Sequence, residues 1–321
     1  MKSSIEIRNI AKETIELELD AISKIKERID ESFVDVVNLI FNSKGRLIIV
    51  GIGKSANIAN KMVATFNSTG QPAIFLHAAD AIHGDLGNIQ QQDIVMFISK
   101  SGNTSEIKTV LPFIKNMGNS IIAITGNMKS FLAQESDVVL DVSVEKEACP
   151  NNLAPTSSTT AQLVIGDAIA VSLLACNNFS DKDFARFHPG GTLGKRLHLK
   201  LSDILSNENN PSVNINTTID KVIIEISRKR LGATVVLENN LVRGIITDGD
   251  LRRMLEKEQF DLSLVASDIM CKNPKMIDIE TLAYDALQLM EEHNISQLVV
   301  MIGEEYKGII HLHEIIKEGV V

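Results

Sequence analysis

Two hydroxyl-rich segments of this 321-residue chain each stand directly ahead of a helix-like run. The first is "SKSGNTSE", residues 99–106, and the second is "PTSSTT", residues 155–160. Hydroxyl and free backbone N–H groups at a helix N-terminus form an anion site. Capping a helix needs only one such residue, so the remaining groups predict that a phosphate or a polyol binds here. The residues are Ser99, Ser101, Gly102, Asn103 and Thr104 in the first segment and Thr156, Ser157 and Ser158 in the second.

Titratable side chains accompany these hydroxyl groups. Glu106 falls in the first turn of the helix predicted after "SKSGNT", and Glu147 lies in the irregular loop "EKEACP". A carboxylate can lift a proton from the carbon next to a carbonyl group while a donor polarises the carbonyl oxygen. His83, His188 and Lys54 lie in loops or turns from which they can assist. We therefore expect proton transfer beside a bound phosphate.

The segment "GIGKSAN" is a third loop of this kind. Gly53 allows a tight turn and a close approach of the backbone to a ligand, and Ser55 opens the next helix. The pattern Gly-x-Gly-x-x-Ala resembles a dinucleotide fingerprint, which by itself is weak evidence. Lys54 favours a small phosphate-bearing ligand instead, although a solvated lysine on a turn is the alternative. Lys100 leaves the same two interpretations open: attraction of a phosphate, or exposure to solvent.

The elements that position these loops follow from hydrophobic patterning. Five short apolar runs alternate with segments of helical length between residues 46 and 144. This alternation predicts a doubly wound α/β fold with a parallel five-stranded sheet, whose ligands lie beyond the carboxyl ends of the strands. Ahead of the sheet, the apolar spacing over residues 5–42 predicts a single helix. Thr159 and Gln162 predict a capping box for the buried helix that follows the last strand.

The last third of the chain contains an internal repeat. The run "SDIL" at Ser202 returns as "SDIM" at Ser267, and "RGIITDGDLRRML" at Arg243 returns as "KGIIHLHEIIKEG" at Lys307. Agreement at both ends of the unit indicates a duplication, and two copies are too few for a solenoid, so a packed pair is expected. The predicted domains are residues 1–198, 199–262 and 263–321.

Composition excludes several classes of protein. The formal charge of −9 argues against nucleic-acid binding, because backbone contacts need clustered Lys and Arg. No run approaches ~18 uninterrupted apolar residues, and the N-terminal segment is dotted with acids, so we expect neither membrane contact nor a signal peptide. Three widely spaced cysteines indicate a reducing, cytoplasmic environment. No His, Cys or Asp cluster has metal-ligand spacing, so we expect no metal and no cofactor.

Taken together, the motifs resemble those of the arabinose-5-phosphate isomerases, which join a sugar isomerase (SIS) domain to paired CBS domains. The resemblance covers nearly the whole chain and rests on "GIGKS", "HAADAIHGDLG", "SKSGNTSE", "EKEACPNNLAPTSSTT", "DFARFHPGGTLGKRL" and "GIITDGDLRR", in that order. It implies interconversion of D-ribulose 5-phosphate and D-arabinose 5-phosphate through a cis-enediol. It also implies a supply of 3-deoxy-D-manno-octulosonate for lipopolysaccharide or capsule. The family's catalytic positions match Lys54, Glu106, Glu147 and His188.

The roles of these residues are hypotheses that the resemblance suggests. Glu147 moves the proton between C1 and C2, and Lys54 stabilises the developing oxyanion. His188 assists ring opening or proton transfer between O1 and O2, from its own subunit or a neighbouring one. Glu106 orients hydroxyl groups or shares the role of base. Shared sites imply at least a dimer, and the family suggests a homotetramer.

The paired CBS modules resemble sensors of adenosine nucleotides. Thr247 and Asp248 in the first module occupy positions that hold a ribose in such domains, whereas His311 and Leu312 in the second lack the acid. An adenosine nucleotide or a pathway product is therefore a candidate regulator. The alternative is that the pair only assembles subunits.

Three other functions fit parts of the sequence. A sugar-phosphate-sensing transcription regulator needs a basic helix-turn-helix, whereas residues 1–45 predict only one long helix. A Rossmann-type oxidoreductase leaves the hydroxyl-rich loops after strands three and five unexplained. A phosphohexulose or sedoheptulose phosphate isomerase would handle phosphate in the same way, and the fold alone does not fix the substrate.

Overall fold

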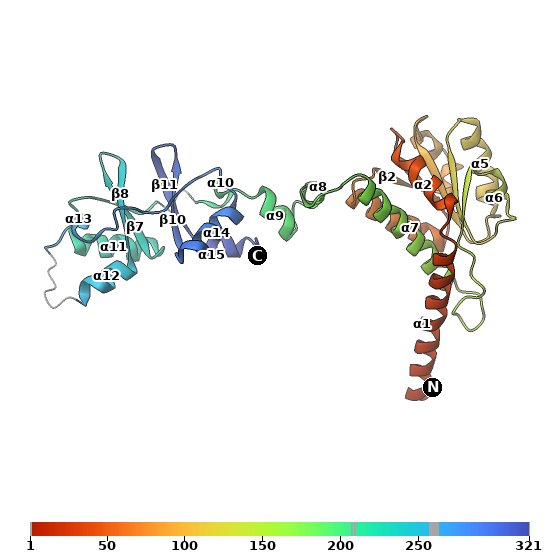
Figure 1. The fold of residues 1–321 in the computed structure, drawn as a ribbon, viewed down its shortest axis with the longest axis horizontal. Coiled ribbons are helices and arrows are strands. Elements are labelled where there is room, and N and C mark those ends of the chain that lie inside the picture. Colours follow the sequence, from red (N-terminus) through yellow and green to blue (C-terminus); the bar gives the residue numbers. More distant parts are fainter. Residues whose placement is uncertain (1, 207, 209, 257–262, 321) are drawn as a thin grey trace. The chain divides into compact units, whose positions relative to one another are not determined.

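The computed structural model describes residues 2–206, 208, 210–256 and 263–320. The chain folds as two compact units, Met1–Phe187 and His188–Val321, whose elements are labelled in Figure 1. The corresponding domain boundary predicted from the sequence lies after residue 198.

The first unit contains the predicted parallel sheet. Its five strands lie in the order β2-β1-β3-β4-β5, and every neighbouring pair is parallel. The doubly wound fold is therefore confirmed, and the carboxyl ends of all five strands lie at one edge. The strands are β1 (Leu47–Gly51), β2 (Ala73–His77), β3 (Ile94–Ser99), β4 (Ile121–Thr125) and β5 (Val138–Asp141).

Helices cover both faces of this sheet, because alternate residues of each strand face opposite sides. In β1, Leu47 and Ile49 join the core of one face, and Ile48 and Val50 join the core of the other. The first face packs against α1 (Ser4–Glu27), α2 (Glu31–Phe41), α3 (Lys54–Ser68) and α7 (Ser157–Cys176). The second packs against α4 (Ala78–Ala81), α5 (Ser105–Asn116) and α6 (Phe131–Glu135), and η1 (Asp85–Asn88) follows α4.

The single helix predicted over residues 5–42 is wrong, since two helices form there. The side chain of Asp30 accepts a hydrogen bond from the backbone N–H of Ser32, so Asp30 caps α2 and ends the continuous helix. Residues 1–45 therefore contain two helices and not the one that was predicted. Of α1, only Ala21 and Ile25 are buried, and its N-terminal part projects away from the sheet (Figure 1).

The helix α7 is the one described helix that is long and apolar enough to cross a membrane. Its buried residues include Ala161, Ile165, Ile169 and Leu173, which belong to the core of the sheet. It contacts α1, α2 and α3, so it forms part of the protein's own core.

The second unit contains the predicted repeat as two three-stranded sheets. They have the orders β6-β7-β8 and β11-β10-β9, and a register shift interrupts the β7–β8 and β10–β11 pairings at equivalent positions. Residues of both halves, among them Val235 and Val299, share one core, which confirms a packed pair. A short helix, α8 (Asp181–Phe187), ends the first unit, and α9 (Thr192–His198) opens the second. The remaining elements are α10 (Leu201–Ile204), β6 (Ser212–Asn214), α11 (Ile219–Lys229), β7 (Ala233–Glu238), β8 (Leu241–Thr247), α12 (Asp248–Leu255), α13 (Ala266–Ile269), β9 (Met276–Asp278), α14 (Ala283–His293), β10 (Gln297–Ile302), β11 (Glu305–His311) and α15 (Leu312–Lys317).

Candidate functional site

A cavity of about 280 Å³ lies at the carboxyl edge of the sheet. It lies where the loops after β1 and β3 meet the start of α7, the region in which ligands bind open α/β sheets. The N-termini of three helices, α3, α5 and α7, contribute to it. The lining residues are Ile52, Lys54, Ser55, Ser99, Lys100, Ser101, Thr104, Pro155, Ser158 and Thr159.

The cavity brings together residues from all three loops that the sequence singled out. Two lysines and several hydroxyl groups converge without any carboxylate in the lining, which suits an anionic ligand. The predicted residues that line it are Lys54, Ser55, Ser99, Ser101, Thr104 and Ser158. The lining also includes Lys100, Pro155 and Thr159, which were not among the predicted binding residues.

Other predicted binding residues in the loop between β3 and α5 do not line the cavity but determine the conformation of the loop. Gly102 has φ +63°, and a Cβ there would lie 2.2 Å from Ser130 Oγ, so only glycine fits. Its N–H donates to Ser99 Oγ at 3.1 Å. Asn103 Oδ1 accepts the backbone N–H of Phe131 at 3.1 Å, which ties the loop to α6. Gly53, with φ +60°, similarly precedes α3 in a conformation that favours glycine.

Thr104 is the N-cap residue of α5, but its side chain makes no capping bond. Its Oγ1 atom is buried and has no hydrogen-bond partner among the residues that the structure describes. A buried hydroxyl without a partner costs about 1–3 kcal/mol, so this group is suited to a ligand in the cavity. Helical capping therefore does not account for the hydroxyl.

Glu147 lies directly behind the cavity wall, with its side chain fully buried. Its Oε1 accepts hydrogen bonds from Lys100 Nζ at 2.6 Å and from Ser158 Oγ. Its Oε2 accepts the N–H of Thr156 at 2.8 Å, the hydroxyl of Thr156 at 3.1 Å and the N–H of Ser158 at 3.1 Å. Because Lys100 and Ser158 line the cavity, these two side chains connect the buried carboxylate with it.

These contacts fix the charge of Glu147. Burial by itself would raise the pKa of this carboxyl group, because it disfavours the charged form. The hydrogen bonds from Lys100, Ser158 and Thr156 outweigh burial and lower the pKa to about 2. Glu147 is therefore a carboxylate at neutral pH.

The predicted capping box of Thr159 and Gln162 is wrong. The helix α7 begins at Ser157, and Thr159 Oγ1 donates to the carbonyl oxygen of Thr156. Gln162 is buried, and its Oε1 has no partner among the described residues. Glu147 performs the capping instead, because it accepts the N–H groups at the helix start. No local spacing could have revealed this contact, since the carboxylate comes from an irregular loop.

Ser157 is also buried at the start of α7, and its Oγ has no hydrogen-bond partner among the residues described here. It does not line the cavity.

The remaining catalytic candidates lie outside the cavity lining. Glu106 is partly exposed in the first turn of α5 and accepts a hydrogen bond from Ser105 Oγ at 2.9 Å. His83 is exposed in the turn after α4. His188 is the first residue of the second unit, where its carbonyl oxygen accepts the N–H of Gly191 at 3.2 Å.

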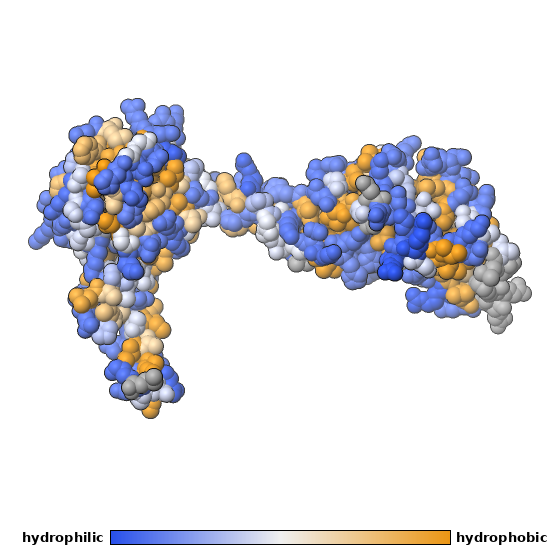
Figure 2. All heavy atoms as spheres, turned by 180° about the vertical axis from the view of Figure 1, so that it is seen from behind, coloured by the Kyte–Doolittle hydropathy of each residue, from blue (hydrophilic) through white to orange (hydrophobic). Residues whose placement is uncertain are grey.

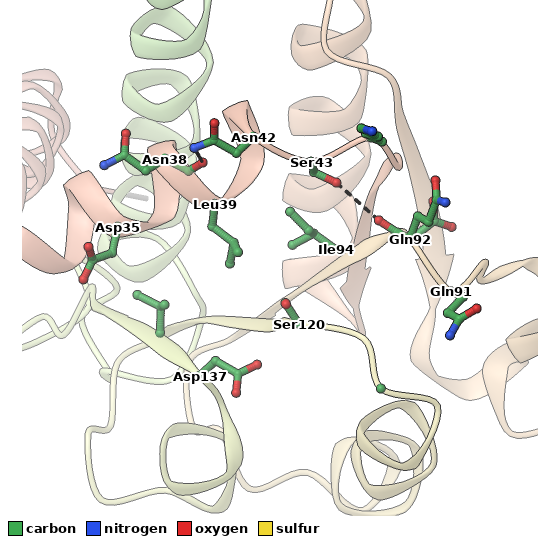
Figure 3. Close-up of a pocket in the computed structure, with 14 residues that line it drawn as sticks. Asp35, Asn38, Leu39, Asn42, Ser43, Gln91, Gln92, Ile94, Ser120 and Asp137 are labelled. Carbon is green, nitrogen blue, oxygen red and sulfur yellow. Dashed lines mark hydrogen bonds between the residues drawn. The ribbon is translucent and has the colours of Figure 1, made fainter.

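A larger cavity of about 770 Å³ lies at the opposite, amino-terminal edge of the sheet (Figure 3). Asp35 and Asp137 face it together with amide side chains such as Asn38 and Gln91. Ser43 Oγ donates to the carbonyl oxygen of Gln92 at 3.2 Å across its rim. With carboxylates in its wall and strand starts around it, this cavity is a poor phosphate site.

The second unit has its own cavity of about 350 Å³ between the two repeats. Thr247 and Asp250 line it, and Asp250 accepts the Thr247 N–H at 2.9 Å and the Thr247 hydroxyl at 2.7 Å. Asp248 is not in the lining and lies close to Gly232. The sequence prediction named Asp248 and missed Asp250, which the capping-box spacing Thr-x-x-Asp could have identified. Arg253, Lys275 and His293 add cationic or titratable groups to the same wall.

Comparison with known proteins agrees with this architecture. The SIS domain family matches residues 39–172, and the CBS domain family matches residues 201–257 and 266–320. An arabinose 5-phosphate isomerase of Francisella tularensis is 50% identical over 314 residues, 96% of each chain. One of Pseudomonas aeruginosa is 43% identical over 100% of this chain and 99% of its own. An Escherichia coli CFT073 protein solved in complex with arabinose 5-phosphate is 37% identical, with a TM-score of 0.57, and covers 59% of this chain and all (100%) of its own.

Proposed function

This chain belongs to the arabinose 5-phosphate isomerase family. We propose that it interconverts D-ribulose 5-phosphate and D-arabinose 5-phosphate in the cavity at the carboxyl edge of the sheet. Relatives that match nearly the full chain carry this name. We further propose that the product supplies 3-deoxy-D-manno-octulosonate synthesis for lipopolysaccharide or capsule, in the cytoplasm. The full-length relatives argue against the oxidoreductase and regulator alternatives.

One observation carries the proposal: a buried, ionised carboxylate lies behind a wall of hydroxyl groups and lysines at a helix N-terminus. The unpartnered hydroxyl of Thr104 and the N–H groups that begin α5 suit the phosphate. Lys54 and Lys100 add positive charge to the same cavity. The phosphate binds at one end of the cavity, and the sugar carbons extend toward the wall in front of Glu147.

Proton transfer is the chemistry of the aldose–ketose exchange. Glu147 takes the proton from C1 of the ketose, or from C2 of the aldose, and returns it to the other carbon of the cis-enediol. Lys54 stabilises the negative charge that develops on the carbonyl oxygen. Glu106 orients the sugar hydroxyls or shares the role of base, and His188 assists transfer between O1 and O2. A positioned base contributes about 10²–10⁴ in rate.

A coupled assay tests the proposed activity. D-Ribulose 5-phosphate is supplied without added metal, and D-arabinose 5-phosphate is measured by its consumption in the next condensation step. We expect arabinose 5-phosphate as the product. Formation of ribose 5-phosphate alone, or of no product, would contradict the proposal. A ketohexose or ketoheptose phosphate used at a higher kcat/KM would assign the chain to another substrate.

For the second unit we propose a regulatory site for an adenosine nucleotide or a product of the pathway. The cavity between the repeats offers Thr247 and Asp250 for a ribose and Arg253 for a phosphate. Asp250 carries its charge, because burial is outweighed by hydrogen bonds from Thr247 and Arg253 that lower its pKa. AMP, ADP and ATP should each be tested for a rise in melting temperature. A rise that Asp250→Asn abolishes supports the site, and no rise with any nucleotide leaves assembly as the role of the pair.

We also propose that the chain forms a homo-oligomer, a tetramer. The projecting part of α1 carries Ile5, Ile7, Ile10, Ile15 and Leu19, each at least 40% exposed. Apolar side chains are visible along this part of the helix in Figure 2. Isolated helices are marginally stable in water and draw most of their stability from packing of an apolar face. A second copy of the chain would provide that packing.

A further inference from the structure

The ion pair between Lys100 and Glu147 joins the proposed phosphate loop to the proposed base. Lys100 stands between Ser99 and Ser101, and all three line the cavity. Its Nζ lies 2.6 Å from Glu147 Oε1, and its side chain is 48% exposed whereas that of Glu147 is 0% exposed. The ammonium group therefore lies where the cavity meets the buried carboxylate.

The Glu147 carboxylate has no lone pair left for a substrate proton. An ionised carboxylate has about four acceptor sites, and side-chain and backbone donors from Lys100, Thr156 and Ser158 already occupy them. If Glu147 is to take a proton from a sugar carbon, one of these donors has to withdraw.

Lys100 is the donor that can withdraw. The N–H groups of Thr156 and Ser158 are fixed at the start of α7, and the hydroxyls of these residues sit on short side chains. Lys100, by contrast, carries its charge on a flexible four-carbon stem that is about half exposed at the cavity. Among the described residues it is also the one charged group that pairs with Glu147.

A bound phosphate provides the competing partner for Lys100. A sugar phosphate carries up to two negative charges, and charge-assisted hydrogen bonds to phosphate are among the strong ones in proteins. In the proposed function, the hydroxyl groups of Ser99, Ser101 and Thr104 hold the phosphate, and these residues line the cavity together with Lys100 of the same loop. The ammonium group can reach this phosphate by a change of side-chain rotamer.

We propose that Lys100 acts as a phosphate-operated latch on Glu147. It pairs with the carboxylate before the substrate binds and moves to the phosphate when the substrate occupies the cavity. Glu147 then has a lone pair without a hydrogen-bond donor, and this lone pair accepts the substrate proton. This inference rests on the proposed function, because it takes Glu147 as the base and the cavity as the phosphate site. Lys100 itself is a positioning residue with respect to the proton transfer.

A double-mutant cycle on phosphate binding tests the latch without any turnover. The affinity for inorganic phosphate is measured by calorimetry for the wild type, Lys100→Met, Glu147→Gln and the double variant. We expect Lys100→Met to weaken binding roughly tenfold, since one charge-assisted contact is lost. Glu147→Gln should tighten binding several-fold in the wild-type background, because Lys100 is then free for phosphate. In the Lys100→Met background it should change the affinity less than twofold.

Two results of this cycle would overturn the latch. If Glu147→Gln changes the phosphate affinity equally with Lys100 and with Lys100→Met, Lys100 does not exchange between Glu147 and the phosphate. Unchanged phosphate affinity in Lys100→Met would show that Lys100 does not reach phosphate. Lys108→Met is the matched control, because Lys108 is an exposed lysine of α5 outside the cavity lining and should leave the affinity unchanged.

Steady-state kinetics provide a second test that does not depend on the folding of the Glu147 variant. In the substrate complex Lys100 already pairs with the phosphate. Lys100→Met should therefore raise KM roughly tenfold and leave the acid limb of the pH profile of kcat unchanged. Lys100→Arg should restore KM to within about threefold. If the acid limb of the pH profile of kcat shifts upward by about one pH unit or more in Lys100→Met, Lys100 stays paired with Glu147 during turnover. That result would overturn the latch. Coupled binding in a protein without isomerase activity would support the latch and contradict the proposed function.

Discussion

The carboxylate of Glu147 accepts the backbone N–H of Ser158, eleven residues later in the chain, at 3.1 Å. Through this bond an irregular loop caps the buried helix α7 and at the same time holds an ionised group behind the cavity wall. The same side chain therefore has a structural role at the helix start and a proposed catalytic role. The two roles can be separated experimentally.

Glu147→Gln should lower kcat by about 10²–10⁴, the usual contribution of a positioned base. The amide keeps the size of the side chain but cannot take a proton at neutral pH. Initial rates in the coupled assay measure the loss, and inorganic phosphate should still bind. Glu106→Gln is the comparison. If Glu147→Gln keeps turnover within a few-fold and Glu106→Gln loses it, Glu106 is the base.

Thr104→Val should weaken substrate binding while leaving the fold intact. Valine has nearly the same shape as threonine and removes a buried hydroxyl that has no protein partner, so the stability should be unchanged or slightly higher. KM should rise roughly tenfold if the hydroxyl binds phosphate. Thr109→Val on the same helix is the control, because Thr109 Oγ1 is exposed and bonded to the Ser105 carbonyl oxygen at 2.9 Å. Equal KM values for both variants would contradict the assignment.

Gly102→Ala should displace the β3–α5 loop. The added Cβ would lie 2.2 Å from Ser130 Oγ and 3.0 Å from Thr125 Oγ1, and φ is +63°. We expect a loss of roughly 2–3 kcal/mol of stability together with weaker phosphate binding. Gly118→Ala is the control, because Gly118 also has a positive φ of +85° but has nothing within 4 Å of an added Cβ. Thermal unfolding should show the smaller loss for Gly118→Ala, and equal losses would refute the role of the contacts.

Acidification should destabilise the wild type partly through Glu147. Its pKa is about 2 in the folded protein and 4.5 when unperturbed, so its stabilisation is complete above about pH 4.5 and is lost as the pH falls toward 2. Between pH 5 and pH 3 this amounts to roughly 2 kcal/mol. Glu147→Gln should lose less stability over this window, as calorimetry can measure. Glu145→Gln, which removes a carboxylate that is 75% exposed, should behave like the wild type; a parallel decline in all three proteins would contradict the assignment.

Ile15→Asp in α1 should lower the oligomeric mass. Ile15 is 59% exposed in the projecting part of the helix, where a charge costs little within one chain but would be buried without a partner in an assembly. Analytical ultracentrifugation measures the mass, and Glu16→Lys on the neighbouring position controls for the change of charge. An unchanged mass for Ile15→Asp would exclude this face from the interface.

The sequence predicted the sheet because its signal is local. Each of the five strands is a continuous apolar run, and burial on both faces of a parallel sheet produces that pattern directly. The repeat of the second unit was equally clear, since the offset between the two copies differs by only one residue between the two ends of the unit. The single N-terminal helix was wrong because Asp30, a capping residue inside a regular apolar spacing, ended the helix where periodicity alone predicted continuation.

The hydroxyl-rich loops were predictable for the same local reason. Residues that follow parallel strands gather at one edge, so Lys54, Ser99 and Ser158 could be expected near one another, and they line one cavity. The sequence also selected Glu147, because local helix capping did not explain an acid in this loop, although in the structure Glu147 caps α7.

Only the tertiary structure decided what surrounds Glu147. Lys100 is 47 residues earlier in the chain and Ser158 is 11 residues later, and no periodicity links residues at such separations. The strand order places β3 beside β1 and brings the β3 loop to the start of α7. From the sequence, Lys100 could be a phosphate ligand or a solvated side chain, and Glu147 could be any loop carboxylate. Packing joined them in one ion pair, because a buried charge is costly unless it is paired and hydrogen-bonded.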